Sequence, residues 1–232
     1  MGQEADIGHY EAFYRGRTIY DLPPARSPYY PLFKQIVAKL KARPPLRVLE
    51  VGCGSGTLAQ LIMERTETDY RGFDFSATAV AKAGARTGRP DAFYIADATD
   101  AASYQLDYDT VVCTEVLEHI ERDKSTIQLW RPGTRCICSV PNFDYDGHVR
   151  FFRSEAEVRN RYHDVIAIDR VMRVPRPVRA GETLGEYLRK LRWSRDEPRR
   201  LLGLLGVGTF DAVGGWFLFD GTARPRQHPA AL

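Results

Sequence analysis

Two glutamates and a histidine stand close together near the middle of the chain. If their segment is helical, Glu115, Glu118 and His119 are spaced to share one face of a turn. His148 follows the next apparent strand and would approach the same place if the two strands are neighbours. Two carboxylates and two imidazoles suit Mg²⁺ or Mn²⁺ and leave positions for substrate oxygens. The spacing therefore predicts a divalent-cation site. Without a cation, His119 or His148 would serve as a general base.

A glycine-rich loop provides a second candidate site. It reads Gly52-Cys53-Gly54-Ser55-Gly56 and lies between an apolar run and a helical pattern. Glycines there let the backbone turn sharply and approach a ligand closely. The third glycine comes one residue too early for the fingerprint of hydride-transfer dinucleotide enzymes. Glu50, just before the loop, also disfavours a pyrophosphate.

Acidic residues follow the next two apparent strands. Asp74 stands 22 residues after Gly52, where a carboxylate can accept hydrogen bonds from ribose hydroxyls. Asp97, followed by Ala98, stands where a carboxylate can accept from an adenine amino group. Together with the glycine loop, these acids predict an adenosine-type ligand across the carboxyl edge of a sheet.

The elements that must position these residues alternate along the chain. Apolar runs predict strands at 46–51, 70–74, 92–95, 110–113, 135–140, 165–171 and 215–219. Helical spacing predicts helices over 29–42, 57–65, 77–86, 125–130 and 155–162, with two more at 182–193 and 197–205. Such alternation with short connections indicates an α/β fold, in which helices cover both faces of a parallel sheet.

We expect one domain spanning 1–232. Its parts are an aromatic-rich arm and helix (1–44), a cofactor-binding core (45–172), a basic lid-like insertion (173–213), the last strand (214–221) and a tail (222–232). From Arg170 to Arg200, ten Lys and Arg face four Asp and Glu, a net charge of +6. Such a segment can meet phosphate or nucleic acid, or can be a solvated helix. We expect the arm and the insertion to close over the ligands and exclude water.

The composition is that of a soluble globular chain, with 44% hydrophobic and 27% charged residues. No apolar stretch approaches the ~20 residues that span a bilayer, and the polar, acidic start of the sequence is unlike a secretory signal. We therefore expect a cytoplasmic location and no membrane contact. The four cysteines include no CxxC pair and predict small buried thiols.

Taken together, the motifs resemble those of class I S-adenosylmethionine-dependent methyltransferases. The resemblance rests on 50–56, 72–75, 96–98 and 110–120 and covers about 45–170. It implies a Rossmann-like fold with a seven-stranded, mostly parallel sheet in the order 3-2-1-4-5-7-6. It also implies S-adenosylmethionine as cofactor and methyl transfer as the reaction. The cofactor-binding residues that we expect are Glu50, Gly52, Cys53, Gly54, Asp74, Phe75, Asp97, Ala98 and Thr114.

The Glu-x-x-Glu-His run at 115–119 is similar to two groups. One is the small-RNA terminal 2′-O-methyltransferases, whose two glutamates and two histidines hold a divalent ion. The other is the small-molecule O-methyltransferases of quinone and sugar pathways. The segment 148–152, His-Val-Arg-Phe-Phe, is similar to bacterial sugar and polysaccharide methyltransferases. These resemblances imply Glu115, Glu118, His119 and His148 as metal ligands, with the two histidines as the catalytic residues.

We therefore expect methyl transfer to a hydroxyl oxygen of a sugar or another small hydroxylated metabolite, assisted by Mg²⁺ or Mn²⁺. The alternative is an RNA ribose 2′-O-methyltransferase with phosphates on the basic segment. That segment has only Tyr187 and Trp193 as stacking residues, whereas single-strand binders combine charge with several. A non-catalytic cofactor-binding module is a third hypothesis. The expected partner is the small-molecule acceptor, and a homodimer is left open.

Overall fold

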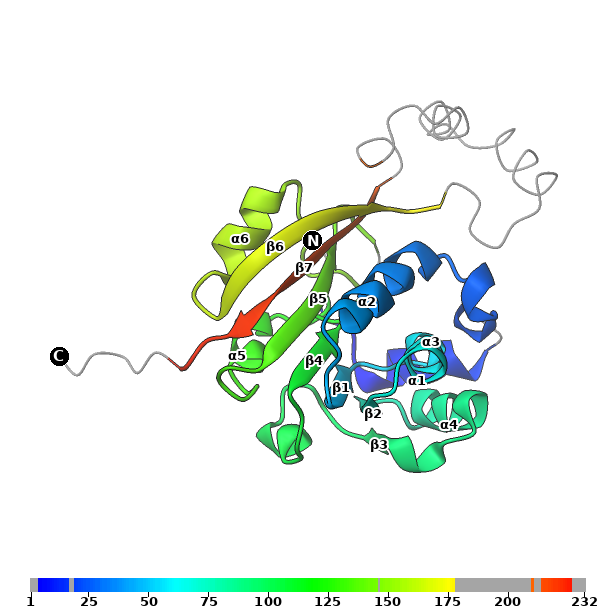
Figure 1. The fold of residues 1–232 in the computed structure, drawn as a ribbon. Helices are drawn as coiled ribbons and strands as arrows, with labels where there is room; N and C mark the ends of the chain where they lie inside the picture. Colours follow the sequence, from blue (N-terminus) through cyan, green and yellow to red (C-terminus); the bar gives the residue numbers. More distant parts are fainter. Residues whose placement is uncertain (1–3, 17–18, 146, 178–209, 211–213, 227–232) are drawn as a thin grey trace, which may run out of the picture.

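A single seven-stranded sheet forms the centre of the molecule (Figure 1). The computed structural model describes residues 4–16, 19–145, 147–177, 210 and 214–226. The strands lie in the order β3-β2-β1-β4-β5-β7-β6, as predicted, and β7 runs antiparallel to both β5 and β6. Their bounds are β1 (Arg47–Val51), β2 (Asp69–Asp74), β3 (Phe93–Ile95), β4 (Thr110–Cys113), β5 (Arg135–Pro141), β6 (Ile166–Pro175) and β7 (Gly215–Ala223).

Helices cover both faces of this sheet. The α-helices are α1 (Ile7–Arg15), α2 (Tyr30–Ala42), α3 (Thr57–Arg65), α4 (Ala77–Thr87), α5 (Asp123–Ile127) and α6 (Glu155–Tyr162). Short 3-10 turns are η1 (Ile19–Asp21), η2 (Pro24–Arg26), η3 (Pro90–Ala92) and η4 (Ala101–Tyr104). Because both faces are covered, the central strands are buried on both sides, which explains their continuous apolar runs.

The helical spacing of α2 has a direct packing consequence. Leu32, Ile36 and Leu40 lie on one face of the helix and are fully buried against the sheet. The end of this helix is held from the neighbouring strand, because the Arg135 guanidinium donates to the carbonyls of Lys39 (3.0 Å) and Arg43 (2.7 Å). The Lys39 carbonyl also accepts from the Arg43 amide (3.3 Å), so Arg135 adds a second donor there and gives the Arg43 carbonyl, beyond the end of the helix, a partner.

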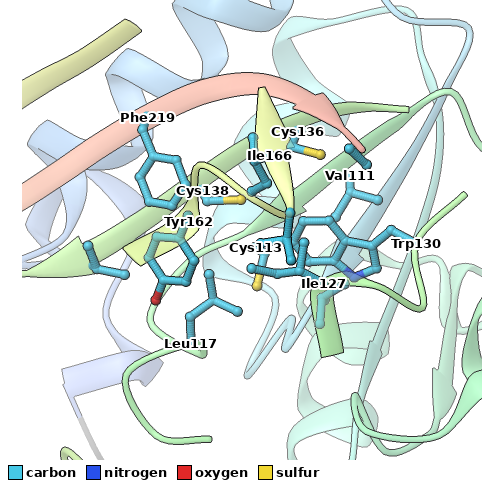
Figure 2. Close-up of a cluster of buried hydrophobic side chains, with 14 of the residues drawn as sticks. Val111, Cys113, Leu117, Ile127, Trp130, Cys136, Cys138, Tyr162, Ile166 and Phe219 are labelled. Atoms are coloured by element: carbon cyan, nitrogen blue, oxygen red, sulfur yellow. The ribbon is translucent and has the colours of Figure 1, made fainter. Parts of the chain in front are cut away.

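The opposite face packs around large aromatic residues (Figure 2). Trp130 follows α5, and Tyr162 ends α6 and stacks on Phe219 of β7. The thiols of Cys113, Cys136 and Cys138 point into this cluster (Figure 2). All four cysteines of the chain are free and buried, which confirms the prediction of small buried thiols.

The predicted start of the insertion and the predicted end of the last strand are wrong. β6 continues to Pro175 and β7 runs to Ala223, so residues 173–175 and 222–223 belong to the sheet. The arm also contains the helix α1, which its aromatic-rich sequence does not reveal. The strands are longer because β6 and β7 extend each other as an antiparallel pair. The helices predicted at 182–193 and 197–205 lie outside the described residues. In the part of the chain that the structure describes, no helix is long and apolar enough to cross a membrane.

Gly56 and Gly88 both have a positive φ, and a comparison of the two separates the cost of backbone strain from the cost of a steric clash. Gly56 precedes α3 with a φ of +76°, and a Cβ there would lie 2.8 Å from the Ala83 Cα of α4. Gly88 follows α4 with a φ of +67° and has open space around it. We predict that Gly88→Ala lowers the free energy of unfolding by about 1 kcal/mol and Gly56→Ala by about 3 kcal/mol. Urea denaturation of the two variants measures this, and equal losses would contradict the packing argument.

Candidate active site

The glycine loop is attached to the second strand by Asp74. One carboxylate oxygen of Asp74 accepts from the Gly54 amide (3.0 Å), and the other accepts from the Ser76 amide (3.0 Å). The Cys53 amide also donates to the Phe73 carbonyl (2.9 Å). These bonds hold the loops after β1 and β2 together at the carboxyl edge of the sheet. Burial raises the pKa of Asp74 to about 6, although both amides oppose the rise.

Two adjoining cavities open at this edge. The smaller, about 140 Å³, is lined by four predicted cofactor residues at or just beyond the ends of β2 and β3: Asp74, Phe75, Asp97 and Ala98. The larger, about 580 Å³, is lined by another four predicted residues: Glu50, Cys53, Gly54 and Thr114. Gly52, the remaining predicted cofactor residue, lines both cavities. The structure therefore brings all nine predicted cofactor residues to the wall of one continuous site.

The N-terminal arm closes one side of both cavities. Tyr10 and Tyr14 of α1 line each of them, and the Tyr10 ring lies against Phe75 (centroids 5.1 Å apart) and His119 (6.0 Å). The sequence predicts that the arm closes over the ligands but does not single out these two tyrosines. Their spacing of four residues, which places them on one side of a helix, is the signal that could have identified them.

Polar bonds fix the arm to the sheet side of the site. The Arg86 guanidinium of α4 donates to the carbonyls of Tyr20 (2.7 Å), Leu22 (3.1 Å) and Ser55 (2.9 Å). Glu11 of α1 accepts from the Thr78 hydroxyl (2.6 Å). Arg86 therefore binds the arm and the glycine loop with one planar group.

A buried cluster of acid and imidazole groups lies beside the cavities. Glu118, His119 and His148 each offer one ligand atom, and these atoms lie within 4.8 Å of one another. His119 lines both cavities and His148 the larger one. Each ring is oriented through Nδ1, which lies 2.9 Å from the Gly147 carbonyl for His119 and 3.3 Å from the Phe143 carbonyl for His148. Because a carbonyl only accepts, both Nδ1 atoms carry the proton and both Nε2 atoms have a free lone pair.

The predicted helical turn through this cluster is wrong. Glu115 has a φ of +57°, so the chain there is left-handed and the following residues form successive turns. Glu115 lies outside the group of three ligand atoms within 4.8 Å, and Ser139 donates to its carboxylate (3.5 Å). Nevertheless Glu115 lines both cavities and its charge acts on Glu118. The sequence thus predicted the neighbourhood and missed the backbone geometry.

The pKa values of the acid and imidazole groups in and beside this cluster are shifted by burial. Glu118 is 0% exposed, and in the described residues neither carboxylate oxygen has a hydrogen-bond partner. Burial and the charge of Glu115 raise the pKa of Glu118 well above its usual range, and burial raises that of Glu115 to about 7. Burial also lowers the pKa of His119 to about 4 and lowers that of His148. Neutral imidazoles beside an unpartnered carboxyl group are the donor set that a divalent cation would complete.

Comparison with known proteins places this geometry in a family. The family model described as "Methyltransferase domain" matches residues 26–190. The chain belongs to this family. The methyltransferase sheet order and the resemblance to class I S-adenosylmethionine-dependent enzymes are thereby confirmed.

Curated relatives of this methyltransferase domain match part of its length. The ubiquinone biosynthesis O-methyltransferase of Salmonella newport (strain SL254) is 35% identical over 104 residues, which are 41% of this chain and 43% of the relative. The protein of the same name from Escherichia coli O127:H6 (strain E2348/69 / EPEC) is 37% identical over the same shares. The matches therefore span less than half the length of these relatives.

Solved structures share the fold at low identity. A chain from the complex of the Haloferax volcanii Trm112 methyltransferase activator with a methyltransferase has a TM-score of 0.66 at 19% identity and covers 97% of this chain and 99% of its own. The N-methyltransferase NodS from Bradyrhizobium japonicum WM9 has a TM-score of 0.53 at 15% identity, covering 86% and 89%. These likenesses show the methyltransferase fold.

The stability of this methyltransferase domain should depend on pH through Glu50. This residue is 2% exposed and receives a hydrogen bond from the Tyr70 hydroxyl (2.5 Å), while burial raises its pKa to about 8. Between its ordinary pKa and about pH 8, the folded state holds a proton that the unfolded state has released. Stability therefore falls as the pH rises through this window.

We predict that Glu50→Gln, which stays neutral, reduces this fall by on the order of 2 kcal/mol. Urea denaturation at pH 5 and pH 8.5 measures the difference between the variant and the unchanged protein. The exposed Glu67→Gln is the control and should follow the unchanged protein. A Glu50→Gln variant with an equally steep pH dependence would show that Glu50 is charged throughout.

Proposed function

We propose that this protein transfers a methyl group from S-adenosylmethionine to a hydroxyl oxygen of a sugar or another small hydroxylated metabolite. The observation that supports this most strongly is the buried cluster of Glu118, His119 and His148 beside two adjoining cavities. Moving a methyl group to an oxygen requires alignment of that oxygen and removal of its proton. The relatives named O-methyltransferases support the same class of acceptor atom.

The smaller cavity fits the adenosine part of the cofactor. Asp74 is buried at the end of β2 and presents carboxylate oxygens suited to ribose hydroxyls. Asp97 is exposed at the rim, where it can accept from the adenine amino group. S-adenosylmethionine supplies an electrophilic sulfonium methyl group. Glu115 lines both cavities, and Thr114 beside it lines the larger one.

Glu118, His119 and His148 fit a divalent cation such as Mg²⁺ or Mn²⁺. The unpartnered Glu118 carboxyl group supplies an oxygen, and the fixed Nδ1–H groups leave both Nε2 atoms as donors. The cation would lower the pKa of an acceptor hydroxyl bound to it. Glu115, which stands beside Glu118, adds negative charge to the same place. Through that cation, His119 and His148 would hold the acceptor oxygen in line with the methyl group.

The larger cavity fits a ring-shaped acceptor. Aromatic side chains from the arm, α2, β7 and the loop after β5 line it: Tyr20, Tyr29, Phe33, Phe143 and Trp216. Sugar rings and aromatic rings both present apolar faces to such walls. The hydroxyl groups of Tyr20 and Tyr29 form a hydrogen bond with each other (2.9 Å) and are polar groups in this otherwise apolar wall. Two ring classes are thus the acceptors to compare.

The cofactor assignment predicts a thermal shift. S-adenosylhomocysteine should raise the melting temperature by mass action, and NAD should not. Asp74→Asn should weaken the binding of S-adenosylhomocysteine about 10-fold or more, because one carboxylate acceptor becomes an amide donor. Differential scanning fluorimetry over a ligand titration measures both effects. The exposed Asp69→Asn on the same strand is the control and should bind normally. Stabilisation by NAD alone would overturn the cofactor assignment.

The cation assignment predicts dependence on metal. EDTA should abolish methyl transfer from labelled S-adenosylmethionine, and Mg²⁺ or Mn²⁺ should restore it. Glu118→Gln should lower kcat by about 100-fold or more while the thermal shift with S-adenosylhomocysteine persists. The exposed Glu121→Gln is the matched control and should keep full activity. If the rate is unchanged in EDTA, no cation takes part in the reaction, and His119 or His148 would act as a general base.

The same assay should be run with methyl glycosides and with catechols as acceptors. Methylation of the glycosides would support the sugar acceptor. Methylation of catechols alone would replace the sugar by an aromatic ring and leave transfer to oxygen intact. No transfer to any hydroxyl compound, in an enzyme that binds S-adenosylhomocysteine, would overturn the proposed reaction.

A further inference from the structure

Arg150 lies in the His-Val-Arg-Phe-Phe segment, next to the cluster in sequence, but does not line either cavity. Its side chain is only 14% exposed. The guanidinium donates to the carbonyls of Leu117, of Ile120 (2.5 Å) and of Glu121 (2.9 Å). Those carbonyls belong to the turns that follow β4, which contain Glu118 and His119. One side chain of the His148 loop therefore satisfies three acceptors of the other half of the cluster.

Two backbone contacts join the same two segments. The Val149 amide donates to the Glu118 carbonyl (2.8 Å), and the His119 ring donates to the Gly147 carbonyl (2.9 Å). Irregular turns have no ladder of their own, so their carbonyls depend on partners from elsewhere. The relative position of His148 and the Glu118–His119 pair is therefore set by bonds between the two segments, and Arg150 makes most of them.

A buried acid orients the guanidinium. Asp123, at the start of α5, is 0% exposed, and one of its oxygens lies 3.2 Å from Arg150 Nη1. The same carboxylate accepts from the Tyr162 hydroxyl (2.9 Å) and the Arg161 guanidinium (2.6 Å) of α6. The two α6 side chains thus hold Asp123 in place. Asp123 in turn orients the Arg150 guanidinium toward the carbonyls of the turns that follow β4.

We propose that Arg150 is a positioning residue that sets the distance between His148 and the Glu118–His119 pair. The proposal rests on the proposed function, because it assigns the cluster a task that needs exact spacing. Arginine is required because its planar fork presents several donors in fixed directions, whereas lysine has a single nitrogen on a flexible stem. Arg150 acts through the cluster and does not itself touch the acceptor cavity.

The test compares Arg150→Lys with Arg153→Ala. Arg153 lies on the same loop, is exposed and packs over the Phe151 ring, so its removal controls for a general effect of losing an arginine. We expect Arg150→Lys to weaken Mn²⁺ binding, followed by electron paramagnetic resonance, by about 10-fold to 100-fold. We expect kcat to fall similarly, with the KM for S-adenosylmethionine and the thermal shift with S-adenosylhomocysteine unchanged. Arg153→Ala should match the unchanged protein in all four measurements.

A second variant separates positioning from folding. Arg150→Ala should regain part of its rate when guanidinium ion is added at a non-denaturing concentration, and Arg153→Ala should not respond. If Arg150→Ala fails to fold, Asp123→Asn, which keeps Arg150 and weakens its orientation, should still lower kcat and Mn²⁺ affinity at unchanged S-adenosylhomocysteine binding. A folded Arg150→Lys variant with normal kcat and normal Mn²⁺ affinity would overturn the proposal, as would a parallel loss of S-adenosylhomocysteine binding.

The outcomes distinguish this proposal from the proposed function. If the unchanged protein neither binds Mn²⁺ nor loses activity in EDTA, the proposed cation site is overturned. In that case two results decide the positioning role alone. They are the fall in kcat of Arg150→Lys, and the recovery of rate when guanidinium ion is added to Arg150→Ala. Conversely, normal metal dependence with an unaffected Arg150→Lys variant overturns the positioning role and leaves the proposed function standing.

Discussion

Buried carboxyl groups at the carboxyl edge of the sheet are the constraint on which the site depends. Glu50, Asp74 and Glu118 are each 5% exposed or less. Removal of a carboxylate from water is expensive unless it gains a proton, hydrogen bonds or a cation. Glu50 has the Tyr70 hydroxyl, and Asp74 has two backbone amides. Glu118 has neither in the described residues, and it is the one that stands beside two imidazoles.

This constraint also explains the position of the arm. Without α1, the smaller cavity would lack the wall that Tyr10 and Tyr14 form, and water would reach Asp74. Excluding water strengthens every charge interaction inside a site. Tyr10 contacts both the cofactor side, at Phe75, and the cluster side, at His119. The arm therefore forms part of the candidate site, although it precedes the sheet in sequence.

The sequence predicts the sheet and the edge at which ligands meet, because alternation of apolar and helical patterns is a local signal. Thr57–Arg65, Thr110–Cys113 and Glu155–Tyr162 have the predicted bounds. The rest is set by contacts between distant segments. The length of β6 comes from its pairing with β7, and the left-handed Glu115 has no signature that spacing can reveal. The Arg150 contacts join residues about 30 positions apart, so no local pattern announces them.

The antiparallel strand β7 has a consequence for how such a domain can diversify. The Arg176 amide donates to the Gly214 carbonyl (3.0 Å), and the Gly215 amide donates to the Asn142 side chain (2.7 Å). The first bond holds together the two ends of the connection from β6 to β7, and the second ties the start of β7 to the loop after β5; Arg176 and Trp216 line the larger cavity. Loop-closure entropy grows only slowly with length, so the chain between the clamped ends can be lengthened, shortened or exchanged at small cost. Changes in that connection would therefore leave the pairing of β6 with β7, and the parallel half of the sheet, in place.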